Sequence, residues 1–194
     1  MRQLLATITK RKEERTLTRK TKWAVIGFVG LLLVCGATAA TLLFLNANKQ
    51  PPVGTKIGET APSFTLEDLD GVPVSLSAFY GRVVILEFWQ TSCPDCRKAM
   101  PHLKALYARY KDKGLVWLGV NLDHDPEVVK TYLKDNGFLD QITLWGSFSA
   151  AMGIVDLFDV DLVPRALVID RRGIIRYMGT YPDEPEASDI EPWL

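Results

Sequence analysis

Ligands for transition metals are scarce in this sequence, which has only three cysteines and two histidines among its 194 residues. A structural zinc site needs four ligands. Besides Cys93 and Cys96 the candidates are Cys35, His102 and His124, which follow no zinc-binding spacing. A copper site of the C-x-x-x-C kind is disfavoured because the cysteine spacing is one residue short. We therefore expect no metal site, and zinc or copper binding stays a minor alternative.

Charged residues are absent from 23–45. At about 1.5 Å per residue this stretch measures roughly 34 Å, enough for a hydrocarbon core of about 30 Å. Eight lysines and arginines but only two glutamates precede it, and short basic flanks stay in the cytoplasm. We expect a basic cytoplasmic tail over 1–22, a transmembrane anchor over 23–45, a linker over 46–57 and one exported domain over 58–194.

A cleaved signal peptide is the competing interpretation of the same segment, because Ala37-Thr38-Ala39 resembles a cleavage site. The apolar run nevertheless continues past that site to Leu45. It is also longer than the roughly 7–15 apolar residues of a signal peptide. We therefore favour an uncleaved anchor.

Basic and acidic residues are unevenly distributed along the chain. The first fifty residues hold nine basic and two acidic side chains, whereas the remainder holds 14 basic and 21 acidic ones. An acidic exported domain offers no positive surface for nucleic acid. We therefore exclude nucleic acid as a partner and interpret the basic tail as a topology signal.

Two cysteines lie three positions apart where an apolar strand, 83–86, gives way to a helix. Pro94 suits the first helical turn, and apolar residues recur with helical spacing at 103, 106, 107 and 110. A helix N-terminus favours a thiolate over a thiol. Cys93 is therefore the expected nucleophile, and Cys96 on the first turn is the expected resolving thiol.

Strand and helix patterns alternate along the rest of the exported domain. Hairpins are expected at 64–66 with 74–76 and at 166–170 with 174–177, further strands at 82–88, 115–121 and 142–145, and helices at 94–113, 126–136 and 147–157. This order predicts an α/β fold with helices on both faces of a sheet.

Several of these motifs together resemble a known fold. Glu87-Phe88-Trp89 leads into Cys93-Pro94-Asp95-Cys96, Pro101 follows five residues later, and Val163-Pro164 precedes a strand. This combination resembles the thioredoxin fold. The segment 58–64 and its hairpin are similar to the TlpA/ResA-like membrane-anchored thiol-disulfide oxidoreductases.

The resemblance implies a mixed central sheet, an N-terminal β-hairpin and an enzyme whose only redox group is the Cys93–Cys96 disulfide, with no separate cofactor. It also implies exported protein substrates that contain disulfides, such as apocytochrome c before haem attachment, and a membrane protein as electron donor. The location it implies is the bacterial cytoplasmic membrane, with a single span and the C-terminal domain on the periplasmic or extracytoplasmic side.

The resemblance also assigns candidate site residues. Pro164 corresponds to a cis-proline, although a trans proline that starts a strand is the ordinary alternative. The candidate substrate-binding residues are Trp89, Pro94, Asp95, Val163 and Pro164. Trp89 lies in an apolar strand, however, where a core position is the simpler interpretation.

Glu87 matches the buried acid of thioredoxin. We expect it to accept the proton of Cys96 as a catalytic residue, the alternative being a strand-end carboxylate paired with a lysine. Negative charge on Glu87 and Asp95 disfavours the thiolate and hence the reduced form, which indicates a reductant. The positive charges of Arg97 and Lys98 favour the thiolate instead, and so act against this conclusion.

Four features depart from the family pattern. Ser92 replaces a tryptophan, Ala99 replaces an acid that some ResA-like members carry, and Arg165 adds a cation beside the substrate groove. The C-terminus is also short and rich in proline, which leaves its packing open. A non-catalytic binding protein or metal carrier remains the alternative function, whereas a peroxidase is disfavoured because Leu86 and Gln90 occupy its motif positions.

Overall fold

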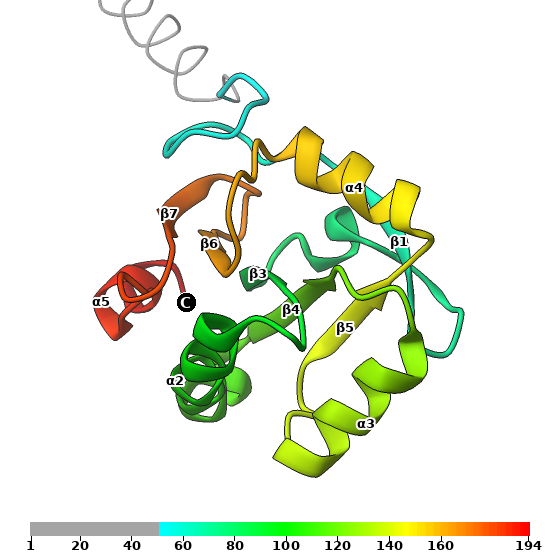
Figure 1. Cartoon of the computed structure of the whole chain (residues 1–194). Coiled ribbons are helices and arrows are strands. Elements are labelled where there is room, and N and C mark those ends of the chain that lie inside the picture. The colour runs from blue at the N-terminus through cyan, green and yellow to red at the C-terminus, as the bar shows by residue number, and fades with distance from the viewer. Residues whose placement is uncertain (1–50) are drawn as a thin grey trace, which may run out of the picture. The chain divides into compact units, whose positions relative to one another are not determined.

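A mixed sheet of seven strands, in the order β2-β1-β5-β4-β3-β6-β7, organises residues 51–194, the part of the chain that the computed structural model describes (Figure 1). The strands are β1 (Thr65–Asp68), β2 (Pro73–Ser75), β3 (Val83–Trp89), β4 (Leu115–Asn121), β5 (Ile142–Trp145), β6 (Arg165–Ile169) and β7 (Ile175–Gly179). The three central strands β3, β4 and β5 are parallel, and antiparallel hairpins extend the sheet at both edges. The mixed sheet and the N-terminal hairpin are as predicted.

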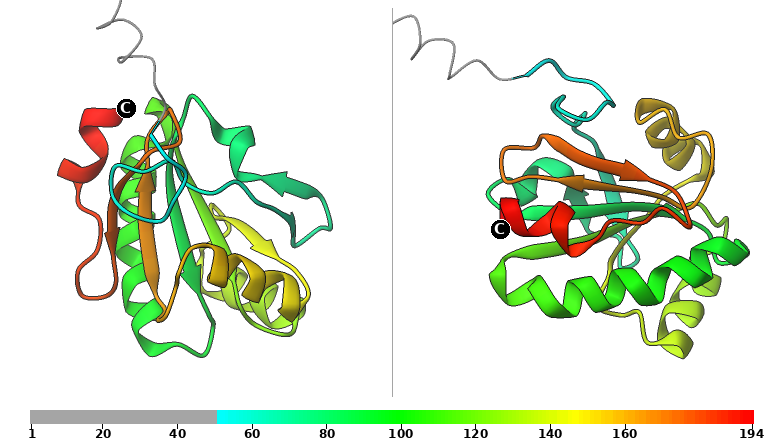
Figure 2. Two further views of the ribbon diagram at one scale, coloured as in Figure 1. Left: turned by 90° about the horizontal axis from the view of Figure 1, so that it is seen from above. Right: turned by 90° about the vertical axis from the view of Figure 1, so that its left-hand side faces the viewer.

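Helices cover both faces of the sheet, as Figures 1 and 2 show. The helices are α2 (Pro94–Tyr110), α3 (Pro126–Asn136), α4 (Phe148–Leu157) and α5 (Ala187–Ile190), with short 3-10 turns at Leu76–Phe79, Lys111–Lys113 and Glu191–Trp193. One apolar core lies between the sheet and α2, α3 and α5, and a second lies between the sheet and α4. Alternation along β3 therefore directs Ile85, Glu87 and Trp89 towards α2.

Local sequence signals account for the helix boundaries. Asp125 caps α3 by accepting a hydrogen bond from the Glu127 backbone N–H at 2.9 Å, and Pro126 occupies the first turn. The helix ends at Gly137, whose φ of 70° places it in the left-handed region. Ser147 likewise caps α4. The predicted helix over 94–113 is α-helical only to Tyr110 and finishes as a 3-10 turn.

The short C-terminus packs firmly despite its proline content. Ile190 is fully buried in the core under α2, and the Tyr110 hydroxyl donates a hydrogen bond to Glu191. The Arg176 guanidinium lies 3.9 Å from the centre of the Trp193 ring. A buried isoleucine and two side-chain contacts thus hold this segment against the domain.

The tail at 1–22, the anchor at 23–45 and the start of the linker lie outside the described residues. The rest of the linker lies against the domain: the Thr60 backbone N–H donates to the Pro52 carbonyl at 2.9 Å, and the Thr60 hydroxyl donates to the Pro51 carbonyl at 3.0 Å. The compact unit accordingly begins at Pro51. Within 51–194 the helices are too short or too polar to cross a membrane.

Candidate active site

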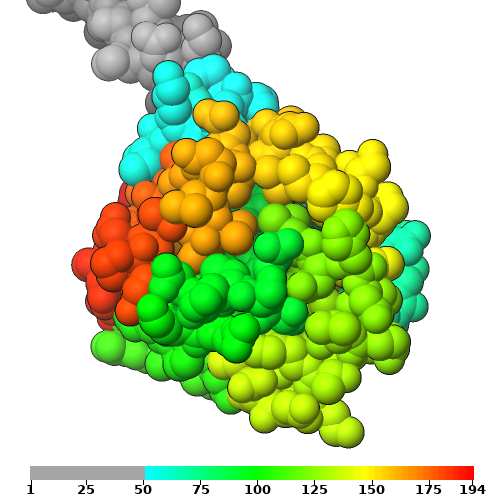
Figure 3. Space-filling model, viewed as in Figure 1, coloured from blue at the N-terminus to red at the C-terminus, as the bar shows by residue number. Residues whose placement is uncertain are grey.

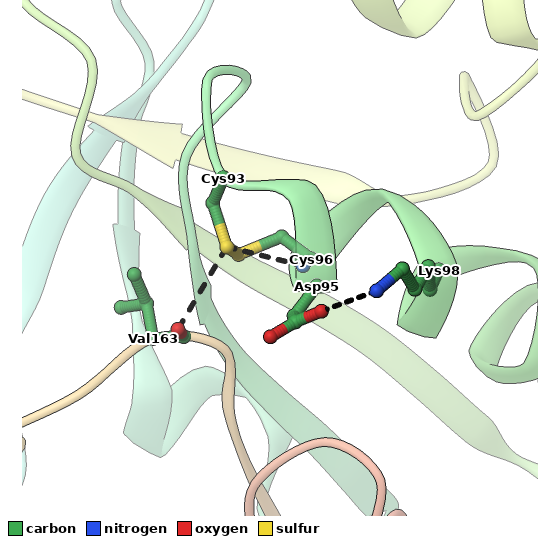
Figure 4. Close-up of polar contacts among 5 residues, drawn as sticks. All are labelled: Cys93, Asp95, Cys96, Lys98 and Val163. Carbon is green, nitrogen blue, oxygen red and sulfur yellow. Dashed lines mark hydrogen bonds and ion pairs between the residues drawn. A yellow bond between two sulfur atoms is a disulfide. The ribbon is translucent and has the colours of Figure 1, made fainter.

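The two cysteines of the motif form a disulfide at the start of α2, with their Cα atoms 5.3 Å apart (Figure 4). Cys93 is the N-cap residue, and its sulfur accepts a hydrogen bond from the Cys96 backbone N–H at 3.1 Å. Cys93 is half-buried, whereas Cys96 is fully buried. Solvent therefore reaches Cys93 first, and a negative charge that develops on its sulfur meets a backbone donor and the helix N-terminus.

The loop before Cys93 is held by the end of the neighbouring strand. The backbone N–H and the hydroxyl of Thr91 donate to the two carboxylate oxygens of Asp123 at 2.8 and 2.9 Å. Asn121 in turn donates its side-chain amide to Asp123 at 2.9 Å. Because β3 and β4 are parallel, their carboxyl ends meet at one edge of the sheet, and this edge positions the disulfide.

The peptide bond between Val163 and Pro164 is cis, as the resemblance implies. The Val163 carbonyl oxygen lies 3.7 Å from the Cys93 sulfur (Figure 4). In the space-filling view the green surface of the α2 region borders the orange segment that leads into β6 (Figure 3). Val163 is half-buried and Pro164 is buried, so the turn offers backbone at Val163 beside the reactive sulfur.

Asp95 and Lys98 form an exposed ion pair one helical turn apart, with 2.7 Å between nitrogen and oxygen (Figure 4). The hydrogen bond from Lys98 to Asp95 raises the pKa of the lysine. Lys98 also lies 5.3 Å from the centre of the Tyr181 ring. Because the Asp95 charge is compensated by Lys98, it opposes a thiolate on Cys93 less than the sequence alone suggests.

Glu87 is fully buried under α2. Its Oε2 atom accepts hydrogen bonds from the Trp117 indole at 3.1 Å and the Gln141 amide at 2.9 Å. Its Oε1 atom has no hydrogen-bond partner among the described residues. These contacts overturn the alternative that Glu87 pairs with a lysine.

Burial raises the pKa of Glu87 from 4.5 to about 8, because the ionised carboxylate loses its hydration. The hydrogen bonds from Trp117 and Gln141 lower the pKa, and the negative charge of Glu184 adds to the rise. A carboxyl group with a pKa near neutrality can both accept and return a proton, which is what general acid–base catalysis requires.

Glu87 borders a small cavity of about 10 Å³, at the lower limit for one water molecule. The walls of this Glu87 cavity include Ala99 and Leu103 from α2, Pro164 from the cis-proline turn, and Glu184 from the segment after β7. Ala99 lies one helical turn after Cys96. Ala99 thus links the cavity to the part of α2 that carries the resolving cysteine.

Two predicted features need correction. Trp89 is fully buried, and its ring packs 5.7 Å from that of Tyr132, so it belongs to the core and offers no surface to a substrate. Arg165 does follow the cis-proline, but its guanidinium donates to Asp161 at 2.6 Å and its side chain is only 19% exposed. The added cation is therefore neutralised locally. Pro94, Asp95 and Ser92 are exposed around the disulfide.

The residues of the site that were not foreseen include Asp123, Gln141, Glu184 and Thr180, whose hydroxyl donates to the Pro164 carbonyl at 2.6 Å. For Asp123 a signal exists, because a carboxylate directly after a strand parallel to β3 is expected near the motif. The other three come from segments that reach the site only through the tertiary fold. Across residues 51–194 the structure holds no group of three or more histidine, cysteine, aspartate or glutamate side chains arranged for a metal ion.

The chain is similar to proteins of a known family. Residues 56–194 match the Redoxin family. A thiol-disulfide oxidoreductase ResA from Bacillus thuringiensis subsp. konkukian is 34% identical over 145 residues, which are 74% of this chain and 79% of the relative. ResA from Geobacillus kaustophilus is 29% identical over 94% of this chain and 97% of its own length.

Solved structures show the same similarity. The thioredoxin domain of a thiol-disulfide oxidoreductase from Bacteroides vulgatus superimposes with a TM-score of 0.62 and 27% identity, covering 71% of this chain and 94% of that domain. A solution structure of a thiol:disulfide interchange protein from a Bacteroides species has a TM-score of 0.61 and 28% identity, covering 69% of this chain and 84% of that one. The disulfide at the helix N-terminus, the cis-proline beside it and these similarities lead to one conclusion: the chain belongs to the Redoxin family, as a ResA-like thiol-disulfide oxidoreductase with the thioredoxin fold.

Proposed function

We propose that this protein is a membrane-tethered reductase of disulfides in exported proteins. The observation that supports this most directly is the asymmetry of the dithiol. Cys93 is accessible beside the Val163 carbonyl, while Cys96 is buried beneath it. An extended substrate can pair with the Val163 backbone and present its sulfur to Cys93, as strand addition allows.

The reaction begins with the reduced dithiol. The Cys93 thiolate attacks one sulfur of the substrate disulfide, which forms a mixed disulfide and releases the other substrate sulfur as a thiolate that takes a proton from solvent. Cys96 then loses its proton to Glu87 and attacks Cys93. The Cys93–Cys96 bond forms and the bond to the substrate breaks. The second substrate sulfur leaves as a thiolate, which also takes a proton from solvent.

The direction of electron flow follows from what stabilises the reduced form. Cys96 is fully buried in an apolar cluster, and Glu87 nearby has no cation partner among the described residues. Burial of Cys96 disfavours its thiolate. Glu87, whose pKa burial raises to about 8, adds to this only in the fraction of molecules in which it is ionised, and the same fraction accepts the Cys96 proton. Both effects raise the free energy of the ionised dithiol. A less stable dithiol gives up its electrons more readily, so the protein acts as a reductant.

The partners follow from this direction. A reductase outside the cytoplasm needs electrons, and we propose that a membrane protein supplies them by reducing the Cys93–Cys96 disulfide. The substrates are exported proteins with disulfides, apocytochrome c before haem attachment being the class that the family resemblance implies. The dithiol itself carries the electrons, with no separate cofactor.

A mixed-disulfide trap tests the proposal. Cys96→Ser removes the resolving thiol but keeps the nucleophile, so the substrate stays covalently joined to Cys93 and can be identified by mass spectrometry. The matched control is the double variant Cys93→Ser/Cys96→Ser, which should trap nothing. Partner binding that survives the loss of both cysteines, or stoichiometric copper or zinc on the reduced protein, would instead support the non-catalytic binding protein or metal carrier.

The membrane anchor is tested separately. We propose that the segment 23–45 stays in the bacterial cytoplasmic membrane as a single span, with the domain on the periplasmic or extracytoplasmic side. A reporter fused after Leu194 should then be active only outside the cytoplasm, and the protein should remain in the membrane fraction. Release of a soluble form beginning near Ala40 would contradict the anchor and support a cleaved signal peptide.

A further inference from the structure

The segment 180–184, between β7 and α5, closes one side of the Glu87 cavity. The Thr180 hydroxyl donates to the Pro164 carbonyl at 2.6 Å, which ties the segment to the cis-proline turn. The Tyr177 hydroxyl donates to the Asp183 carbonyl at 2.8 Å and fixes the other end. The segment is thus held in place over the cavity and brings Glu184 to its wall.

Glu184 resembles Glu87 in how its carboxyl group is placed. The Oε1 atom of each is buried without a hydrogen-bond partner among the described residues, and both residues line the same cavity. Burial raises the pKa of Glu184; the charge of His102 opposes this rise, and the charge of Glu186 adds to it. Glu184 as a whole is only half-buried, whereas Glu87 is fully buried.

Two carboxyl groups at one small cavity disfavour the doubly ionised state, because like charges in a poorly solvated space repel strongly. One proton between them relieves this repulsion. Of the two residues, only Glu184 is partly exposed to solvent. We propose that Glu184 is a positioning residue that passes protons between Glu87 and solvent and keeps the carboxyl group of Glu87 ready for the dithiol.

The proposal rests on the thiol-disulfide exchange described above and adds a route for its proton. When Cys96 attacks Cys93, the Cys96 proton moves to Glu87 while the new disulfide forms and the substrate sulfur leaves as a thiolate. The proton then moves from Glu87 to Glu184, directly or through a water molecule in the cavity, and from Glu184 to solvent. The substrate thiolate takes a proton from solvent, so charge and atoms balance.

The groups around the pair come from several elements. Trp117 on β4 and Gln141 just before β5 donate to Glu87 but do not titrate in the relevant range. Tyr181 and Asp183 line the cavity from the segment 180–184. Burial raises the pKa of Tyr132 on α3, the charge of Arg97 opposes this rise, and the charge of Glu87 adds to it.

His102 on α2 contacts the Pro185 carbonyl at 2.9 Å and approaches Glu186 to 3.9 Å. The charges of His102 and Glu186 act on Glu184, whereas Glu184 is the group whose charge raises the pKa of Glu87. A substitution at Glu184 should therefore change the pKa of Glu87.

The test follows the rate at which the full chain resolves a mixed disulfide between Cys93 and glutathione, from about pH 5 to about pH 10. We expect Glu184→Gln to slow this step by on the order of tenfold, since proton transfer by a positioned group contributes about 10²–10⁴-fold and Glu87 is kept. The pH profile should also move to lower pH, because removing the Glu184 charge lowers the pKa of Glu87. Glu67→Gln, an exposed change on β1, should leave both rate and profile unchanged.

A second variant separates the proton route from a merely structural role. Glu184→Asp keeps the carboxyl group and should restore most of the rate. This comparison separates the two roles even if Glu184→Gln lowers the free energy of unfolding. A wild-type rate and pH profile in Glu184→Gln would overturn the proposed role of Glu184 but not the proposed exchange function. Failure of the wild-type chain to resolve the glutathione adduct at all would overturn the proposed exchange function together with it.

Discussion

Gly119 on β4 lies directly opposite Glu87 on β3 in the parallel register. A Cβ atom at this position would lie 2.4 Å from the Gln141 Oε1 atom and 2.7 Å from the Trp89 indole nitrogen. Trp89 is fully buried and cannot move aside easily. The missing side chain of Gly119 is therefore what allows Gln141 to reach the Glu87 carboxyl group.

Gly119→Ala should consequently destabilise the protein by about 1–3 kcal/mol, the usual cost of overpacking a well-packed core. It should also disturb the hydrogen bond from Gln141 to Glu87. The matched control is Gly153→Ala in α4, where an added Cβ meets nothing within 4 Å. That change should stabilise the protein by roughly 0.5–1 kcal/mol. Chemical denaturation of both variants measures the difference, and equal unfolding midpoints would contradict it.

The raised pKa of Glu87 predicts how stability depends on pH. The folded state keeps the Glu87 proton up to about pH 8, whereas an unfolded chain releases it at a pKa of 4.5. Between these values the folded state binds more protons than the unfolded state, so the free energy of unfolding falls as pH rises. The total loss attributable to Glu87 is on the order of several kcal/mol.

Glu87→Gln removes this titration while keeping a similar shape. The free energy of unfolding of the oxidised variant should therefore fall less than that of the wild type between about pH 5 and about pH 8. Glu67→Gln, at an exposed position, should keep the wild-type dependence. Parallel curves for wild type and Glu87→Gln would show that Glu87 does not titrate in this window.

The C-terminal segment should contribute to stability through Ile190, which is fully buried and packs under α2. Ile190→Ala should cost about 2–5 kcal/mol, because it removes buried methylene groups and leaves a cavity. Leu139→Ala is a suitable comparison, since Leu139 is 70% exposed, and it should change stability by no more than about 0.5 kcal/mol. If the two changes shifted the urea midpoint equally, the tail would not be part of the core.

The two cysteines should differ in reactivity once the disulfide is reduced. Cys93 is half-buried at the helix start, and Cys96 is fully buried. Alkylation near neutral pH should therefore modify Cys93 first. Mass spectrometry of partly alkylated protein measures the order, and early modification of Cys96 would reverse the assignment of nucleophile and resolving thiol.

Much of the fold is predictable from the sequence because its strands and helices carry strong local signals. The apolar runs 83–86 in β3 and 115–118 in β4 indicate strands buried on both faces, and Asp125-Pro126 and Gly137 mark the ends of α3. The motif of two cysteines likewise identifies the reactive group without a structure.

The environment of that group is less predictable. Gln141 and Glu184 lie far from Glu87 along the chain. The register of the sheet brings Gln141 to the site, and the path of the segment after β7 brings Glu184. Trp89 shows the opposite error: the family resemblance makes it a candidate substrate-binding residue, but strand alternation directs its ring into the core, as its apolar strand also indicates.

The reduction potential of the Cys93–Cys96 pair tests the central claim most directly. Equilibration of the full chain with glutathione or dithiothreitol buffers, followed by quantification of free thiols, gives its value. A reductant should have a potential near that of thioredoxin, about −270 mV. A potential near that of the oxidant DsbA, about −120 mV, would contradict the account.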